Sequence, residues 1–217
     1  MGGVRVVEVN IRDIASLRVR TNDVALFEVL GCGAYGVDLS LLGPVERVLD
    51  LGANVGLTAI YLSRRMPEAR FCAVEPAPCS FALLEENLRR NAVPGIAVRA
   101  AAMAKPGNVA VVEGEHAGLT TVQRDPAGPI EGQTIPDLLD RAGFEQADLL
   151  KLDIQGGEAE LLEHCEDWAP RVGAVIAEIH APLTVDGALA ALAPYGFRRL
   201  PLPSGRLFDD MLYARRD

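Results

Sequence analysis

The sequence contains little cysteine and no Cys-x-x-Cys pair. Four cysteines occur among 217 residues. One of them, Cys72, lies inside an apolar, strand-like run, where a buried thiol acts as a small hydrophobic group. This usage is typical of a protein from a reducing compartment, so we expect a cytoplasmic location.

Long apolar runs are also absent. Asp, Asn or Arg interrupts each run well before the roughly 20 residues that a membrane-spanning helix needs. The first residues, Met1 to Val6, lack the apolar region of a signal peptide, and Val6 stands where a myristoylation motif has Ser or Thr. We therefore expect a soluble protein with no membrane segment.

Positive charge is scarce. The 21 Lys and Arg residues face 30 Asp and Glu residues, which gives a net charge of -9. No stretch concentrates Lys or Arg as a groove that follows a phosphate backbone would. The chain also lacks the Gly-x-x-x-x-Gly-Lys-[Ser/Thr] loop of many nucleoside triphosphate sites. These absences disfavour nucleic acid as a substrate and give no support for a triphosphate site.

Short β-rich runs alternate with longer helix-period runs from about Val45 onward. This alternation is typical of a doubly wound α/β fold, with a mostly parallel sheet covered by helices on both faces. The expected strands are 47–51, 70–75, 96–102, 148–153, 174–180, 198–202 and 210–215. The expected helices are 56–65, 79–91, 135–141, 157–165 and 185–193. A Pro203-Ser204-Gly205 turn joins the last two strands, so we expect them to pair as an antiparallel hairpin at the C-terminus.

The remaining segments have weaker patterns. Residues 108–113 are expected to form one additional strand, and the polar stretch 114–133 has no clear periodicity, which indicates a loop or lid. At this length, one domain over residues 1–217 is expected. Its Rossmann-like core would span 45–217, and residues 1–44 would form a helix-and-strand cap over one end of the sheet.

A glycine-containing turn follows the first strand of this core. The strand ends at Asp50 and Gly52, and Gly56 opens the next helix. Glycine gives clearance to a ligand that lies across the carboxyl edge of the sheet, and the helix N-terminus supplies free N–H donors. Glu75 ends the next strand, 23 residues after Gly52, close to the spacing of the ribose-binding acid in doubly wound folds. The pattern predicts a nucleoside at this edge.

Charged side chains also mark the ends of two later strands. Lys151 and Asp153 share one face of the strand 148–153 by period-two alternation. Lysine is unusual inside a buried strand and requires a partner, so the pair is either part of a functional opening or a structural ion pair. Glu178 and His180 share a face at the end of the strand 174–180.

Taken together, these segments resemble the FkbM family of S-adenosylmethionine-dependent methyltransferases. The resemblance covers roughly residues 45–180. It is carried by Leu-Asp-Leu-Gly-Ala-Asn-Val-Gly at 49–56, Val-Glu-Pro at 74–76 with Asn87 and Asn91 after it, and Lys-Leu-Asp-Ile-Gln-Gly-Gly-Glu at 151–158. The last segment is the most discriminating. The chain departs from the family pattern at Gln155, where Glu is common.

The resemblance implies a seven-stranded class I methyltransferase sheet, S-adenosylmethionine as cofactor and O-methylation of a small molecule such as a natural product or a sugar. By matching positions, the methionine pocket would be shaped by Asp50, Gly52, Asn54 and Gly56, and Glu75 would hold the ribose. Ala101 or Ala102 would lie near the adenine, and Asp153 near the cofactor's amino group or the substrate.

Methyl transfer from a sulfonium is an in-line displacement with a neutral leaving group, so positioning carries most of the catalysis. His180 is the first candidate for a base that takes the acceptor's proton, followed by Asp153 and Glu178. Asp153 and Glu178 could be oxygen ligands of a divalent metal, but the sequence has no compact ligand motif, so no metal is expected. The acceptor's identity and the oligomeric state have no readable pattern.

Two alternatives remain from the sequence. The chain could be an S-adenosylmethionine-binding protein that has lost catalysis, with Gln155 as the only hint. It could also be a nicotinamide-dependent oxidoreductase, because Gly31-Cys32-Gly33-Ala34-Tyr35-Gly36 matches Gly-x-Gly-x-x-Gly. Only residues 37–42 separate this match from Gly43-Pro44, which is too short for the expected helix. In the methyltransferase interpretation, Tyr35 would cover the methionine part of the cofactor.

Overall fold

The computed structural model describes residues 5–11, 15–21, 38–113, 120–201 and 210–217. Tyr35 and the Gly31–Gly36 segment lie outside these residues, as does the Pro203-Ser204-Gly205 turn. Within the described ranges, no helix combines the length and the apolar character needed to cross a membrane.

A seven-stranded sheet forms the centre of the molecule, with the strand order β12-β13-β11-β10-β3-β4-β5. Its parallel strands are β3 (Arg47–Leu51), β4 (Arg70–Val74), β5 (Gly95–Val98), β10 (Ala147–Leu152) and β11 (Val172–Glu178). Strand β13 (Met211–Arg216) pairs antiparallel with both β11 and β12 (Phe197–Arg199). The expected mostly parallel, doubly wound sheet and the antiparallel pairing at its C-terminal end are both confirmed.

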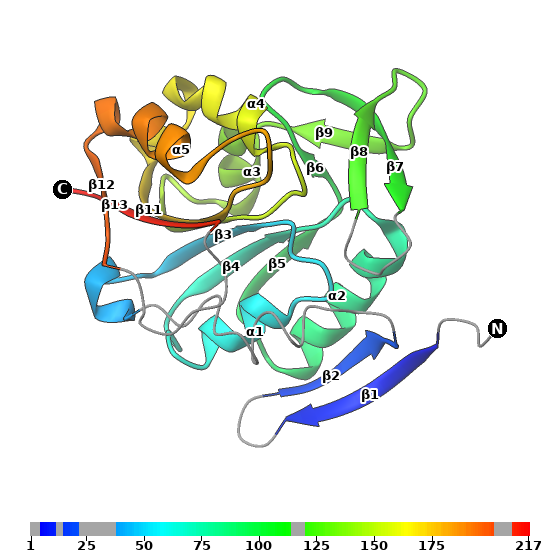
Figure 1. The fold of residues 1–217 in the computed structure, drawn as a ribbon. Coiled ribbons are helices and arrows are strands. Elements are labelled where there is room, and N and C mark those ends of the chain that lie inside the picture. The colour runs from blue at the N-terminus through cyan, green and yellow to red at the C-terminus, as the bar shows by residue number, and fades with distance from the viewer. Residues whose placement is uncertain (1–4, 12–14, 22–37, 114–119, 202–209) are drawn as a thin grey trace.

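Helices cover the two faces of this sheet (Figure 1). One face carries α1 (Leu57–Ser63) and α2 (Pro78–Arg90), and the other carries α3 (Ile135–Ala142), α4 (Glu158–Glu163) and α5 (Val185–Leu192). Short 3-10 helices complete the fold as η2 (Leu39–Leu42), η3 (Cys165–Asp167), η4 (Ala169–Arg171) and η5 (Ala193–Tyr195). Apart from Asp50 in β3 and Lys151 in β10, the buried side chains of the central strands are apolar on both faces, because each face packs against helices, and they form two hydrophobic cores.

Local sequence explains where these helices begin and end. Thr134 and Asp137 form a capping box at the start of α3, and Gly143, in the left-handed conformation, ends it. Arg89 and Arg90 lie in the last turn of α2, where positive charge is favourable. These signals agree with the helices expected from periodicity.

The expected strand 96–102 is wrong as a single element. Strand β5 ends at Val98, and Ala101 and Ala102 form β6 of a second sheet with the order β6-β9-β7-β8. Its other strands are β7 (Gly107–Glu113), β8 (Thr120–Arg124) and β9 (Ile130–Gln133). The expected strand at 108–113 is confirmed. The loop or lid expected over 114–133 is wrong where β8 and β9 form, because a small apolar cluster that includes Val109 and Ile130 packs there without a long hydrophobic run.

The N-terminal segment forms an antiparallel hairpin of β1 (Val6–Ile11) and β2 (Ala15–Arg20). The hairpin lies on the outer side of α1 and α2 (Figure 1). Ala15, Leu17 and Val19 alternate along β2 and are buried in the core on this face. The hairpin thus covers the layer of α1 and α2 and does not lie over one end of the sheet. A cap formed by residues 1–44 as a whole stays a prediction.

Candidate functional site

The turn after β3 requires glycine at two positions. Gly52 and Gly56 adopt φ values of 72° and 87°, in the left-handed region. A Cβ atom at Gly52 would overlap the carbonyl oxygen of Asp153, and one at Gly56 would lie 2.8 Å from Cδ1 of Leu84. The backbone N–H of Gly52 donates to the carbonyl of Val74 at 3.0 Å. The turn is therefore packed tightly between the ends of β4 and β10.

Glu75 lies directly against this turn. Its Oε2 accepts a hydrogen bond from the backbone N–H of Asn54 at 2.9 Å, and its Oε1 accepts one from Ala77, also at 2.9 Å. Burial raises the pKa of Glu75 to about 7, although the hydrogen bonds from Ala77 and Asn54 oppose the shift. The structure thus brings Glu75, Asn54, Gly52 and Gly56 together. Their contacts with a cofactor stay a prediction.

Lys151 is buried between two carboxylates. Its Nζ lies 3.3 Å from Oδ1 of Asp50 and 3.6 Å from Oδ2 of Asp153, and it donates hydrogen bonds to the carbonyls of Leu51 at 3.2 Å and Gly52 at 2.7 Å. Burial raises the pKa of Asp50, and the positive charge of Lys151 opposes this shift. Lys151 is therefore an ion-paired residue that also holds the turn after β3.

Asp50 and Asp153 have different surroundings. Asp50 has no exposed surface, so in this conformation it supports the turn through Lys151 and touches no solvent. Asp153 is partly exposed and accepts a hydrogen bond from Nε2 of Gln155 at 3.0 Å. Gln155 adopts φ of 58°, and a Glu at this position has no hydrogen to donate to Asp153. The departure at Gln155 thus has a structural consequence at Asp153.

Glu158 belongs to the candidate site but was not among the candidate residues inferred from the sequence. It is fully buried at the start of α4, and its two oxygens accept hydrogen bonds from the backbone N–H groups of Ile154 and Gly156, each at 2.9 Å. The Nδ1 of His180 lies 3.2 Å from Oε1 of Glu158. An acid at a helix N-terminus inside the 151–158 segment was the available signal.

His180 lies between two carboxylates. Its Nε2 is 3.7 Å from Oε1 of Glu178, on the side opposite Glu158. The hydrogen bond to Glu158 raises the pKa of His180 to about 9, although burial opposes this. For Glu158, burial favours a higher pKa, but the hydrogen bonds from His180 and Ile154 lower it overall. At neutral pH the pair is an imidazolium with a carboxylate.

Ligand atoms of Asp153, Glu158 and His180 all lie within 4.8 Å of one another, close enough for one cation. Each Glu158 oxygen already accepts a backbone N–H, and His180 is held as the charged partner of Glu158. These residues fit an ion pair better than a metal centre, which needs unprotonated ligands. The expectation that no metal takes part stays a prediction.

Ala101 and Ala102 follow the end of β5 and are both buried in β6. The backbone N–H of Glu75 donates to the carbonyl of Val98 at 3.1 Å, so the end of β5 is joined to the end of β4 beside Glu75. A place near an adenine ring stays a prediction for both alanines.

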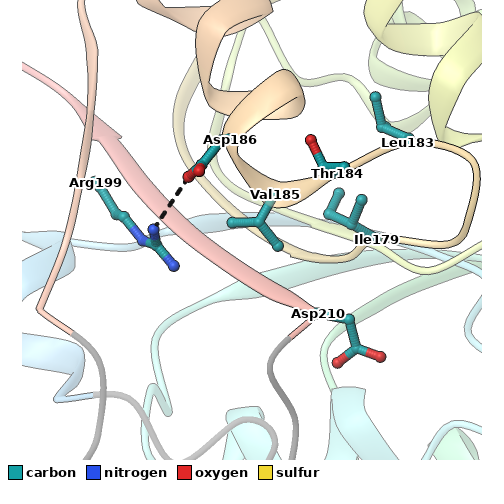
Figure 2. A pocket seen from close by; sticks show the side chains of 7 residues that line it. All are labelled: Ile179, Leu183, Thr184, Val185, Asp186, Arg199 and Asp210. Atoms are coloured by element: carbon teal, nitrogen blue, oxygen red, sulfur yellow. Dashed lines mark hydrogen bonds and ion pairs between the residues drawn. The ribbon is translucent and has the colours of Figure 1, made fainter.

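A pocket of about 480 Å³ lies beyond the end of β11 (Figure 2). Its lining residues are Ile179, Leu183, Thr184, Val185, Asp186, Arg199 and Asp210. Arg199 and Asp186 face each other there, with 3.4 Å between Nη1 and Oδ1. In the strand order, β10 lies between β11 and β3, so the end of β10, where Asp153 lies, is between the strand end that borders the pocket and the Gly52 turn.

Residues 50–199 match the model of a methyltransferase FkbM domain. The chain belongs to the FkbM methyltransferase family. It is therefore a methyltransferase, and S-adenosylmethionine is its cofactor. The match spans the Gly52 turn, Glu75, the 151–158 segment and His180. The nicotinamide alternative, which rested on Gly31–Gly36, has no support from this family.

This chain shares modest sequence identity with curated relatives. The chain is 27% identical over 166 residues to methyltransferase sdnD of Sordaria araneosa, covering 60% of this chain and 64% of that protein. It is 29% identical over 203 residues to the 31-O-demethyl-FK506 methyltransferase FkbM of Streptomyces tacrolimicus, covering 75% of each. It is 28% identical over 134 residues to the hexuronic acid methyltransferase AglP of Haloferax volcanii, covering 61% of this chain and 55% of that protein. The chain thus spans less than two thirds of two of these relatives.

Solved structures show the same fold. The methyltransferase FkbM of Methylobacillus flagellatus superposes with a TM-score of 0.51 at 18% identity, covering 79% of this chain and 44% of that one. The Aeropyrum pernix fibrillarin, solved with natively bound S-adenosyl-L-methionine, superposes with a TM-score of 0.55 at 18% identity, covering 98% and 82%. The class I methyltransferase fold is confirmed.

Proposed function

We propose that this FkbM-family enzyme transfers the methyl group of S-adenosylmethionine to a hydroxyl oxygen of a small molecule. The observation that carries the proposal is the buried Glu75 carboxylate, bonded to Asn54 of the turn at the carboxyl edge of the sheet. The printed names of two relatives, an FK506 methyltransferase and a hexuronic acid methyltransferase, support a natural product or a sugar as acceptor. The net charge of -9 disfavours nucleic acid.

Two groups of residues would hold the cofactor. Glu75 would accept hydrogen bonds from the ribose hydroxyls, and Ala101 or Ala102 would border the adenine. The methionine part would lie against the turn that contains Gly52, Asn54 and Gly56, which Asp50 supports through Lys151. Asp153, partly exposed beside Lys151, would face the cofactor's amino group or the acceptor. Tyr35 is proposed as a cover for the methionine part.

Labelled methyl transfer tests this proposal directly. Purified protein would be incubated with S-adenosylmethionine carrying a labelled methyl group and with a panel of hydroxylated macrolides, uronic acids, a peptide and an RNA oligonucleotide. Label on a hydroxyl of a small molecule is the expected result, and it would exclude a binding protein without catalysis. Label found only on peptide or RNA would refute the small-molecule acceptor.

The charge state of His180 makes the proposed proton transfer depend on pH. Only neutral imidazole accepts a proton, and the pKa of His180 is raised to about 9. If His180 is the base, kcat/KM rises with pH, about tenfold per unit, and levels off near pH 9. The measurement is a kcat/KM profile from pH 6 to 10. A profile that is flat from pH 7 to 9 would exclude His180 as the base.

We further propose that the acceptor enters through the pocket beyond β11. Val185 lines this pocket and is half-buried at the start of α5, so Val185→Trp would fill part of it. The expected result is an acceptor KM raised about tenfold with an unchanged affinity for S-adenosylmethionine, which equilibrium binding and initial rates would measure. Ala190→Trp on the exposed side of α5 is the matched control. An unchanged acceptor KM in Val185→Trp would place the acceptor elsewhere.

Three expectations from the sequence remain proposals. We propose a cytoplasmic location, which the described cysteines support because Cys72, Cys79 and Cys165 form no disulfide. The single domain over residues 1–217 and a reaction without a metal are likewise proposed.

A further inference from the structure

The N-terminal hairpin is joined to α2 by two asparagine side chains that replace a missing strand partner. Oδ1 of Asn87 accepts from the backbone N–H of Arg18 at 2.7 Å, and its Nδ2 donates to the carbonyl of Arg18 at 2.9 Å. Asn91, one helical turn later, makes the same two bonds with Ser16, at 3.1 and 2.9 Å. Both asparagines are buried, so the edge of β2 is fixed in one register on the helix.

Asn87 also contacts the turn after β3, where the cofactor is proposed to bind. Nδ2 of Asn87 also donates to the carbonyl of Val55 at 2.8 Å. One buried amide therefore holds both β2 and the segment between Gly52 and Gly56. The position of the hairpin and the position of the turn are set by a common group, which is fully buried.

Arg20, at the end of β2, makes the direct connection. Its Nη2 donates to Oδ1 of Asn54 at 3.1 Å and to Oγ of Ser80 at 2.9 Å. Asn54 has a left-handed backbone, with φ of 48°, and its N–H binds Glu75. Ser80, in the first turns of α2, is almost fully buried. Arg20 thus joins the turn after β3, through Asn54, to the start of α2, through Ser80, and Glu75 lies between these two segments in the sequence.

A non-glycine residue in the left-handed conformation is strained, and surrounding contacts must maintain it. For Asn54, those contacts come from its N–H to Glu75 and from its side chain to Arg20. Without the Arg20 bond, the turn would sample other conformations, and a ligand would have to order it on binding.

We propose that Arg20 is a positioning residue for S-adenosylmethionine, which makes the N-terminal hairpin a functional part of the cofactor site. The inference rests on the proposed assignment of the cofactor to Glu75 and the Gly52 turn. Arg20 acts through Asn54 and Ser80, by holding the turn and the start of α2 at a fixed separation before the cofactor arrives.

The test is calorimetric binding of S-adenosylmethionine to Arg20→Met, which keeps an unbranched apolar stem in place of the aliphatic part of the arginine and removes its donors. Loss of the bridge should raise Kd about tenfold, the scale of one or two hydrogen bonds. The KM for S-adenosylmethionine should rise similarly, and kcat at saturating cofactor should stay unchanged, because the methyl transfer itself is untouched. A wild-type Kd in Arg20→Met would overturn the inference.

Arg18→Met is the matched control, because Arg18 lies two residues earlier on the same strand and its side chain pairs with Glu86 away from the turn. It should leave the Kd unchanged. In a double-mutant cycle, Arg20→Met and Asn54→Ala should be clearly non-additive, whereas additive losses would contradict a bridge. Ser80→Ala removes one acceptor without altering the hairpin and should raise Kd about threefold, which keeps the test valid if Arg20→Met folds poorly.

Glu75→Ala distinguishes a wrong cofactor assignment from a wrong role for Arg20. If Glu75→Ala binds the cofactor as the wild type does, the site assignment itself fails. If Glu75→Ala weakens binding but Arg20→Met and Ser80→Ala do not, the site stands and the role of Arg20 is refuted.

Discussion

Replacing Lys151 with methionine should lower the free energy of unfolding by about 3–5 kcal/mol, the cost typical of removing one partner from a buried ion pair. Lys151 and Asp50 are both almost fully buried, and Nζ of Lys151 lies 3.3 Å from Oδ1 of Asp50, so removing Lys151 takes the positive partner from a buried carboxylate. The mutation also removes the donor to the carbonyls of Leu51 and Gly52. In urea titrations, the midpoint should fall while the slope stays constant.

A second variant distinguishes the charge effect from the loss of packing. Asp50→Asn combined with Lys151→Met removes both charges and should recover a large part of the lost stability, because no unpaired charge remains buried. Lys105→Met is the matched control: Lys105 is the only other lysine in the chain and is exposed. A Lys151→Met midpoint equal to that of the wild type would show that Asp50 is neutral in the folded protein.

Glu75→Ala should weaken S-adenosylmethionine binding about 100-fold, from the loss of the hydrogen bonds between the ribose hydroxyls and the two oxygens of the Glu75 side chain. The backbone N–H groups of Asn54 and Ala77 would also lose their partner, so the turn would be less ordered before binding. Isothermal titration calorimetry of the wild type and of Glu75→Ala gives the two Kd values to compare.

Two further variants complete that experiment. Glu75→Gln keeps the shape and one acceptor oxygen, but its NH2 group would face a backbone N–H, so an intermediate loss of about tenfold is expected. Glu68→Ala removes an exposed carboxylate before β4 and should bind like the wild type. Equal affinity in Glu75→Ala and Glu68→Ala would remove the basis for placing the ribose at Glu75.

The sequence predicted much of this fold because its main signals are local. Apolar strand cores, the periodicity of α2 and the glycines around Gly52 depend on neighbouring residues, and all appear where expected. The second sheet was missed because β8 is polar and short, and its pairing with β7 comes from residues that are not adjacent in sequence. Strand edges that pair at a distance leave little trace in periodicity.

Local sequence patterns likewise predicted only part of the candidate site. Strand alternation placed Lys151 with Asp153 and Glu178 with His180, but it could not show which partner each would find. The ion pair between Glu158 and His180 joins α4 to the end of β11, and it decides the protonation of His180. Arg20 gave no signal, because the residues that receive its hydrogen bonds, Asn54 and Ser80, lie far along the chain.

The contact between Lys151 and Gly52 also orders events during synthesis of the chain. Gly52 emerges early, and its carbonyl meets Nζ of a residue made 99 positions later. The first half, from β3 to β5, can form its parallel strands and helices before then, since those contacts are close in sequence. The turn after β3 already has its contacts with Val74, Glu75 and Asn87 within this half, but the hydrogen bonds from Lys151 form only when β10 has inserted beside β3. The turn should therefore reach its final packing only after the second half of the chain has been made.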